Sequence, residues 1–297
     1  MLRCLTNEER AQFGRDGFLT FDPCIPPREI ALIRETLLHL HRTNTGFGEG
    51  ALFDALSPDD SQGPQQFPQI MHPRNYAPEL RETAFFRVAL EIARQVLGQG
   101  ARFKADLSLL KPAFTGKATP WHQDEAFQDP AFEYQEISFW LALQDVDKSN
   151  SCMGYIPGSH RGEVLPHRFP GDDARVHALD CGLDTDTAAA VFCPLPAGGC
   201  VMHTQRTVHG ATANVSNRER LAYVLIFDCV PVPTEVPRSF PWRAMQRTAR
   251  AQRELAWRRR GGLLVHLWRQ RSRVRLTSMR TLLFDLRRAI IALLGIM

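Results

Sequence analysis

EISFWLALQDV (residues 136–146) and RLAYVLIFDCV (residues 220–230) are runs of apolar and aromatic residues of the kind that form β-strands. Four related runs lie around them: ARFKADLSLLK (101–111), CMGYIPGSH (152–160), GGCVMHT (198–204) and TVHGATAN (207–214). Several short strands at this spacing, with few helical patterns between them, are typical of two packed β-sheets. The sequence therefore predicts a sandwich or double-sheet roll over about residues 101–231.

Helical patterns precede this β region. TNEERAQFGRDGF (6–18) begins with a capping threonine and PPREIALIRETLLHLH (26–41) carries apolar residues at helical spacing, so both predict helices. Between them GFLTFD (17–22) predicts a short strand. ELRETAFFRVALEIARQVLG (79–98) predicts a further helix that ends at its glycine. The fold class is thus expected to be mostly β with flanking helices.

Charge is distributed unevenly along the chain. The 297 residues carry a formal net charge of +4, but residues 241–297 contain fourteen Arg and two acidic residues, whereas residues 1–240 contain 22 basic and 30 acidic residues. The composition, 44% hydrophobic and 23% charged, excludes disordered, collagen-like and disulfide-scaffold classes. We expect one domain over residues 1–240 and a basic, amphipathic helical tail over residues 241–297.

The basic tail has three interpretations. In residues 263–297 apolar residues recur at helical spacing with arginines between them, as in helices that lie on an anionic membrane surface. The same apolar stripe would also suit packing on the acidic body of the chain. Nucleic-acid binding is disfavoured because that body would repel phosphates. The pattern leaves the first two interpretations open.

The cysteines and the hydropathy pattern predict a cytoplasmic protein. Seven cysteines are scattered singly without a CxxC pair, and an odd number leaves at least one outside any disulfide scheme. Charged residues interrupt the start of the chain before an apolar run of signal-peptide length. The apolar stretch 289–297 has nine residues, where a spanning helix needs about 20. A lipid-binding tail would hold the protein on the inner face of the membrane. The sequence carries no signal for the oligomeric state.

Two segments of the β region carry candidate metal ligands. PWHQDEAF (120–127) places His122 and Asp124 two residues apart, and residues i and i+2 of a strand project from the same face. His209, on another predicted strand, would complete a set of two imidazoles and one carboxylate. This set leaves coordination positions open and suits non-haem Fe(II). A metal-dependent hydrolase, or a cupin-like metal-binding protein that is not an oxygenase, would use the same ligands.

An arginine suited to a carboxylate ligand follows the last histidine. Arg220 lies eleven residues after His209, and its planar guanidinium suits a bidentate contact with a carboxylate. Arg218 lies two residues earlier and would share the same face of the strand. Spacing alone does not separate these two arginines.

Four segments, in this order, carry a resemblance to a known family: EERAQFGRDGFLTF (8–21), LLKPAFTGKATPWHQDEAF (109–127), FWLALQDVDKSNSCMGYIPGSHRG (139–162) and HGATANVSNRERLAY (209–223). Over about residues 6–230 the chain resembles the phytanoyl-CoA dioxygenase (PhyH) family of Fe(II)- and 2-oxoglutarate-dependent oxygenases. The resemblance implies a double-stranded β-helix core of the jelly-roll, cupin-like kind. It also implies a hydroxylase that uses Fe(II), 2-oxoglutarate and O2, with ascorbate as an optional reductant, and that releases succinate and CO2.

The resemblance assigns roles residue by residue. It implies that His122, Asp124 and His209 bind the iron. Arg220, at the family's offset from the last histidine, would bind the C5 carboxylate of 2-oxoglutarate. The presence of Asp124 implies hydroxylation rather than halogenation.

Three further residues are implied near the cosubstrate. Trp140 matches an aromatic residue that packs beside 2-oxoglutarate, and Lys111 matches a basic residue near the site. Thr119 would supply a hydroxyl group. A core role for Trp140 and a surface role for Thr119 are the alternatives. Leu107 stands where ectoine hydroxylases carry an arginine, so an ectoine-like substrate is not expected.

The substrate is not specified by these motifs. Residues 43–75, rich in Gly, Pro, Asp, Ser and Gln, predict a long loop, and we expect this loop and residues 161–190 to form the pocket walls. With a membrane-bound tail the substrate would be lipid-linked, such as a Kdo-type sugar on a lipopolysaccharide precursor. With the tail packed on the body it would be a small molecule or natural product.

Overall fold

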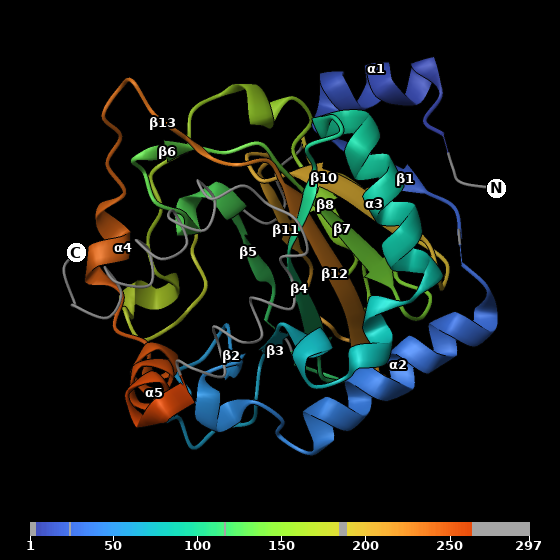
Figure 1. The fold of residues 1–297 in the computed structure, drawn as a ribbon. Helices are drawn as coiled ribbons and strands as arrows, with labels where there is room; N and C mark the ends of the chain where they lie inside the picture. Colours follow the sequence, from blue (N-terminus) through green and yellow to red (C-terminus); the bar gives the residue numbers. More distant parts are fainter. Residues whose placement is uncertain (1–3, 24, 116, 184–188, 263–297) are drawn as a thin grey trace.

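The structure is a computed structural model that describes residues 4–23, 25–115, 117–183 and 189–262 (Figure 1). In these ranges the α-helices are α1 (Asn7–Asp16), α2 (Pro27–Arg42), α3 (Ala84–Leu97), α4 (Pro241–Met245) and α5 (Ala249–Trp257). The short helical turns are η1 (Phe47–Glu49), η2 (Pro73–Asn75), η3 (Pro78–Arg81), η4 (Asp124–Phe127), η5 (Ser159–Arg161), η6 (Pro170–Asp172) and η7 (Arg258–Gly262).

Two antiparallel sheets form the centre of the fold. The major sheet has the order β1 (Phe18–Phe21), β10 (Cys200–Thr204), β7 (Glu136–Ala142), β12 (Arg220–Asp228), β4 (Arg102–Lys111), β3 (Pro68–Met71), β2 (Leu52–Asp54). The minor sheet has the order β5 (Thr119–His122), β11 (His209–Ala211), β8 (Met153–Tyr155), β9 (Val191–Cys193). A separate pair consists of β6 (Phe132–Glu133) and β13 (Val232–Pro233).

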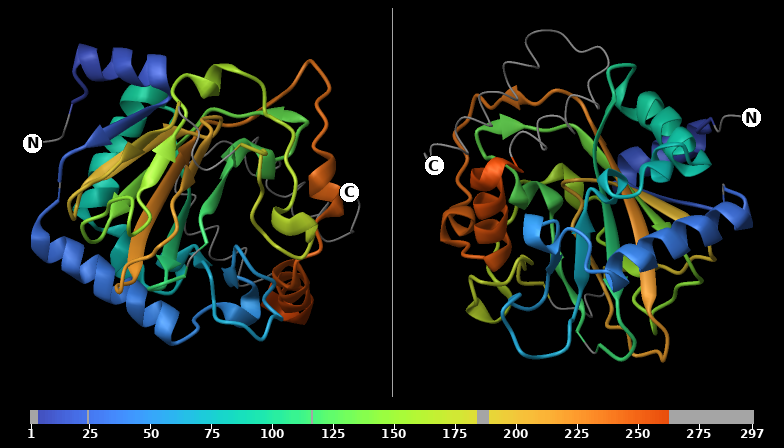
Figure 2. Two further views of the ribbon diagram at one scale, coloured as in Figure 1. Left: turned by 180° about the vertical axis from the view of Figure 1, so that it is seen from behind. Right: turned by 60° about the horizontal axis from the view of Figure 1, so that its bottom comes forward.

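Alternating side chains of the major sheet pack on its two faces. In β7, Phe139 and Leu141 belong to the core that includes residues of α2 and α3, whereas Trp140 packs with residues of the minor sheet. This is the period of two expected of a strand buried on both faces. Figures 1 and 2 show α2 and α3 along one side of the molecule and α5 on the opposite side. The prediction of a mostly β fold with two packed sheets and flanking helices is confirmed.

The N-terminal helices follow their sequence signals. The Thr6 hydroxyl accepts a hydrogen bond from the Glu9 amide, and the Glu9 carboxylate accepts one from the Thr6 amide, which makes a capping box at α1. Helix α3 is followed by Gly98 as expected, but it begins at Ala84 because Pro78–Arg81 forms the turn η3.

The expectation of an unbroken loop over residues 43–75 is wrong. Strands β2 and β3 extend the major sheet within it, and Ile70 of β3 is fully buried opposite Ser108 of β4. These strands are short, β3 begins at a proline, and turn residues surround them, so the local pattern gives no strand signal. Their pairing depends on the edge that β4 offers from a distant part of the sequence.

Residues 241–262, the described part of the basic tail, pack on the body. Trp242 is buried and its Nε1 donates to the Ala126 carbonyl at 2.9 Å, while Arg250 Nε donates to the Gly50 carbonyl at 2.9 Å. This part of the tail agrees with the packed interpretation. The predicted amphipathic helix over residues 263–297 lies outside the described residues. Among the helices that the structure describes, none is long and apolar enough to cross a membrane.

Helix α5 lies against Gly50 so closely that we expect Gly50→Ala to displace it. Gly50 has φ of +74°, and an added Cβ would lie 2.8 Å from the Arg250 carbonyl oxygen. Because alanine disfavours a left-handed backbone and its Cβ would collide with this oxygen, we expect Gly50→Ala to lower the free energy of unfolding by about 2 kcal/mol. Urea unfolding of Gly50→Ala and of the control Gly48→Ala, whose Cβ would meet no atom within 4 Å, measures the difference. Equal stability of the two variants would contradict this packing.

His41 is expected to make stability depend on pH. Burial lowers its pKa from 6.5 to about 4, and its Nε2 lies 2.9 Å from the Ser108 hydroxyl. Between these two pKa values the unfolded chain binds the proton that the folded chain does not, so the free energy of unfolding falls as the pH falls. From about pH 7 to about pH 5 this group should contribute a loss of about 2 kcal/mol.

The pH dependence is checked by urea unfolding of His41→Gln at both pH values. This variant should lose less stability on acidification than the wild type, whereas His39→Gln, at an exposed position on the same helix, should behave like the wild type. An unchanged pH dependence in His41→Gln would show that the buried imidazole is not responsible.

Candidate metal and cosubstrate site

The three predicted metal ligands converge where β5 and β11 pair. His122 and His209 are direct partners in this pairing, and Asp124 follows as the first residue of η4. One ligand atom from each of the three residues lies within 4.8 Å of the others. The predicted arrangement on one strand face is not what brings His122 and Asp124 together, because β5 ends at His122 and the chain turns into η4 before Asp124.

Backbone hydrogen bonds orient both imidazoles. His122 Nδ1 lies 2.8 Å from the Pro120 carbonyl, and His209 Nδ1 lies 2.9 Å from the Thr207 carbonyl. Since a carbonyl only accepts, each Nδ1 must carry the proton when the ring is neutral, which leaves Nε2 with its lone pair. Both Nε2 atoms lie 3.6 Å from Asp124 Oδ1. The two Nε2 lone pairs and the Asp124 carboxylate therefore face a common point, as a metal site requires.

Electrostatics hold the three groups in the protonation state that binds metal. Burial lowers the pKa of each imidazole to about 4, and a neighbouring histidine, His209 for His122 and His203 for His209, adds to this effect. Burial alone would raise the pKa of Asp124, but His209, His203 and His122 together lower it. At neutral pH the site thus offers two neutral imidazoles and an ionised carboxylate.

Arg220 and Arg218 differ in their burial. Arg218 is exposed, whereas Arg220 is 1% exposed and lines the cavity that contains the three ligands. Its Nη1 and Nη2 make long contacts of 3.4 Å with the Leu109 carbonyl and the Ser151 hydroxyl, and its Nε has no hydrogen-bond partner.

Within the described part of the chain no carboxylate pairs with Arg220. Burial lowers the pKa of Arg220 to about 9, so the guanidinium stays charged at neutral pH. A buried cation without an anionic partner is costly, and an anionic ligand would offset that cost.

Trp140 and Thr119 line the same cavity with unused polar atoms. Trp140 Nε1 and Thr119 Oγ1 are both buried without a hydrogen-bond partner. Trp140 also lies near Arg220, whose guanidinium carbon is 5.4 Å from the indole ring centroid. Both residues therefore fit a polar ligand beside Arg220.

Lys111 lies next to Arg220 in the sheet but not on the cavity surface. The two residues are direct partners in the pairing of β4 with β12, and Lys111 is fully buried. Its Nζ donates to the Thr212 and Lys117 carbonyls at 2.9 and 3.2 Å. Burial and the charge of Arg220 lower the pKa of Lys111. Lys111 therefore does not offer its amino group to a ligand in the cavity.

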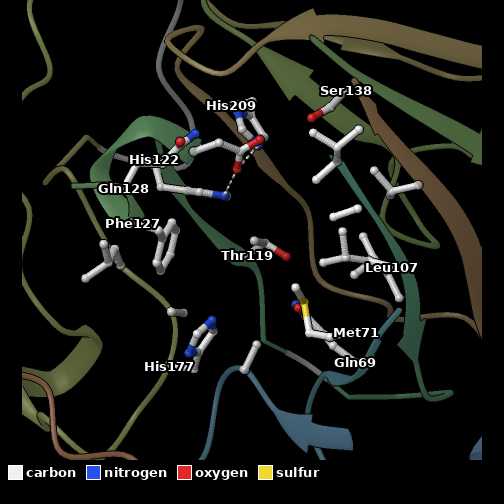
Figure 3. Close-up of a pocket in the computed structure, with 18 of the residues that line it drawn as sticks. Gln69, Met71, Leu107, Thr119, His122, Phe127, Gln128, Ser138, His177 and His209 are labelled. Carbon is white, nitrogen blue, oxygen red and sulfur yellow. Dashed lines mark ion pairs between the residues drawn. The ribbon is translucent and has the colours of Figure 1, made fainter. Parts of the chain in front are cut away.

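The cavity has a volume of about 860 Å³ and is formed by segments from across the chain (Figure 3). Both segments expected to form its walls contribute: Gln69 and Met71 come from residues 43–75, and His177 comes from residues 161–190. The start of the tail also lines it, through Trp242, Arg243, Ala244, Gln246 and Arg250, and Phe240 lines it just before the tail. The sequence motifs gave no indication that the tail would line the cavity.

Sequence reasoning gave no site role to His203, which contacts the metal-site carboxylate. His203 Nε2 lies 3.5 Å from Asp124 Oδ2, and its Nδ1 lies 3.2 Å from the Tyr155 hydroxyl. Its position six residues before His209 was compatible with this approach, but only the pairing of β10 into the major sheet places it there. Ser151, which contacts Arg220 from a left-handed turn at φ of 75°, was missed for the same reason.

Comparisons with known proteins show what the chain is similar to. The model of the family described as phytanoyl-CoA dioxygenase (PhyH) matches residues 13–222. A probable phytanoyl-CoA dioxygenase of Caenorhabditis elegans is 24% identical over 225 residues, 71% of each chain. A probable alpha-ketoglutarate-dependent hypophosphite dioxygenase of Stutzerimonas stutzeri is 22% identical over 218 residues, 72% of this chain and 75% of that protein. The crystal structure of EvdO2 from Micromonospora carbonacea var. aurantiaca complexed with 2-oxoglutarate is similar with 33% identity and a TM-score of 0.69, covering 82% of this chain and 98% of that one.

Proposed function

Since the chain belongs to the phytanoyl-CoA dioxygenase family, and is therefore an Fe(II)- and 2-oxoglutarate-dependent dioxygenase, we propose that it hydroxylates a C–H bond of a small organic substrate. Succinate and CO2 are the products of the cosubstrate. Family membership favours this function over a metal-dependent hydrolase or a cupin-like protein that is not an oxygenase.

The observation that carries the proposal is the convergence of His122, Asp124 and His209, with ligand atoms within 4.8 Å. Two Nε2 atoms and one carboxylate oxygen would hold Fe(II) and leave positions for other ligands. Bound iron, 2-oxoglutarate and O2 supply the oxidising power, which no side chain has. The protein's own part is to fix the ligand atoms, and the Nδ1 bonds to Pro120 and Thr207 do this.

Arg220 would bind the C5 carboxylate of 2-oxoglutarate. Its burial, its unpaired Nε and its place on the cavity wall support this role. Thr119 Oγ1 and Trp140 Nε1 would supply neutral donors beside the cosubstrate, and Lys111 would lie behind the cavity surface as the strand partner of Arg220. A carboxylate bound here would turn a costly buried cation into a charge-assisted pair.

The substrate is proposed to be a small molecule or natural product bound in the cavity of about 860 Å³. Packing of residues 241–262 on the body supports this alternative, because they form a cavity wall instead of standing apart as an anchor. A lipid-linked substrate, such as a Kdo-type sugar, and binding to an anionic membrane stay predictions that depend on residues 263–297.

The proposed function is tested by O2-dependent succinate release across small amino acids, acyl-CoAs, natural products and lipid-linked sugars. A true substrate should increase succinate release and gain one oxygen atom in its mass. Succinate release without oxygen incorporation into any compound would show that the protein consumes 2-oxoglutarate but does not hydroxylate. That result would reject the hydroxylase proposal.

A further inference from the structure

The cavity has a basic end that the proposed iron and cosubstrate site does not use. This end is formed by α4 and α5, which lie outside the family match over residues 13–222. Arg243 and Arg250 from this segment line the cavity. The match and the motifs therefore say nothing about what these two cations do.

Arg250 is the surplus cation of a small charge cluster. Two carboxylates lie near it, but Asp59 pairs with Arg253 at 2.7 Å and Glu254 pairs with Arg258. Arg250 donates a hydrogen bond only through Nε, to the Gly50 carbonyl at 2.9 Å. In the described ranges of the chain no carboxylate lies within ion-pair distance of Arg250. Its two terminal nitrogens thus lack an anionic partner.

The guanidinium of Arg250 is held against Phe53. Its central carbon lies 4.5 Å from the Phe53 ring centroid, an arrangement that fixes the plane of the guanidinium and leaves its edge available. Burial lowers the pKa of Arg250, and its place in the first turn of α5 is the unfavourable end of a helix for a cation. An anionic ligand at this position would offset both effects.

A row of aromatic rings connects Arg250 with the metal site. The Phe53 ring meets His177 with centroids 4.5 Å apart, and His177 stacks on Phe127 at 5.4 Å. Phe127 in turn lies 6.1 Å from the His122 ring. In Figure 3 Phe127 lies between His122 and His177 on one wall of the cavity. A substrate along this wall would have one end near the iron ligands and the other near Arg250.

We propose that Arg250, assisted by Arg243, binds an anionic group of the substrate, a carboxylate or a phosphate, while the apolar part of the substrate lies along His177 and Phe127. This inference rests on the proposed function for the location of the reacting end. It narrows the substrate class to molecules with an anion at one end and an oxidisable C–H bond at the other.

The inference is tested with three probes of equal chain length: octyl phosphate, octanoate and 1-octanol. Each is titrated calorimetrically, without O2, into protein saturated with Fe(II) and 2-oxoglutarate, so that Arg220 is already occupied. At least one anionic probe should bind about 10-fold or more tightly than 1-octanol, since a charge-assisted bond is worth at least that factor. The tighter of the two anions identifies the group as phosphate or carboxylate.

Two variants decide whether Arg250 is responsible. Arg250→Gln should remove the preference for the anionic probe, and Arg250→Lys should retain part of it. Arg247→Gln removes the same charge from the same segment at an exposed position that does not line the cavity, and should keep the preference. Thermal unfolding checks that all variants are folded. Equal binding of all three probes to the wild type, or an undiminished preference in Arg250→Gln, would overturn the inference.

A parallel titration separates this inference from the proposed function. The probes are titrated into iron-free Arg220→Gln, which has neither iron nor the cosubstrate cation. An anion preference that persists there supports the Arg250 site even if no succinate is ever released. Succinate release with no anion preference in either protein would support the proposed function and reject the Arg250 site.

Discussion

His122→Ala is expected to reduce succinate release from 2-oxoglutarate by about 1,000-fold or more, because the iron would lose one of three protein ligands and metal catalysis is worth several kcal/mol. The two remaining ligands, Asp124 and His209, would also lose the neighbour that completes their geometry. Succinate is measured with saturating Fe(II), 2-oxoglutarate and O2, together with the iron content of the purified protein.

His39→Ala is the matched control, because it removes an exposed imidazole on α2. It should release succinate at the wild-type rate. If His122→Ala kept both full iron content and the wild-type rate, the assignment of this residue as an iron ligand would be wrong.

Arg220→Gln is expected to raise the KM for 2-oxoglutarate by about 100-fold, because truncating one partner of a buried charged pair costs several kcal/mol. The C5 carboxylate is remote from the reacting end of the cosubstrate, so we expect kcat to change much less than KM. Steady-state kinetics with varied 2-oxoglutarate gives both constants.

Arg218→Gln is the control for charge, since it changes an exposed arginine two residues away. Its KM should equal that of the wild type. Iron content should be normal in both arginine variants, which separates loss of the cosubstrate contact from loss of the metal. An unchanged KM in Arg220→Gln would reject the proposed contact.

The β core was predictable because its signal is local. The continuous apolar runs at 136–142 and 220–228 are typical of strands that are buried on both faces, and the helices 7–16 and 84–97 carry their caps in their own sequences. The motif residues likewise gave the three candidate ligands that the structure brings together.

The rest depends on contacts between distant segments. Residues 68–71 form a strand because β4 offers them an edge, and residues 52–54 then pair with that strand. Asp124 reaches the imidazoles through a turn rather than along a strand. Spacing alone did not separate Arg220 from Arg218. The family resemblance favoured Arg220, and the fold shows that Arg220 is buried whereas Arg218 is exposed. Arg250 joined the cavity wall only because Gly50 lets α5 approach.

A crystal structure of the protein prepared with Fe(II) and 2-oxoglutarate without O2 would show whether one cavity holds iron on His122, Asp124 and His209 and 2-oxoglutarate on Arg220. Iron should be bonded to both Nε2 atoms and the Asp124 carboxylate, and the far carboxylate of 2-oxoglutarate should lie on the Arg220 guanidinium. Iron bound elsewhere, or 2-oxoglutarate with no contact to Arg220, would contradict this assignment.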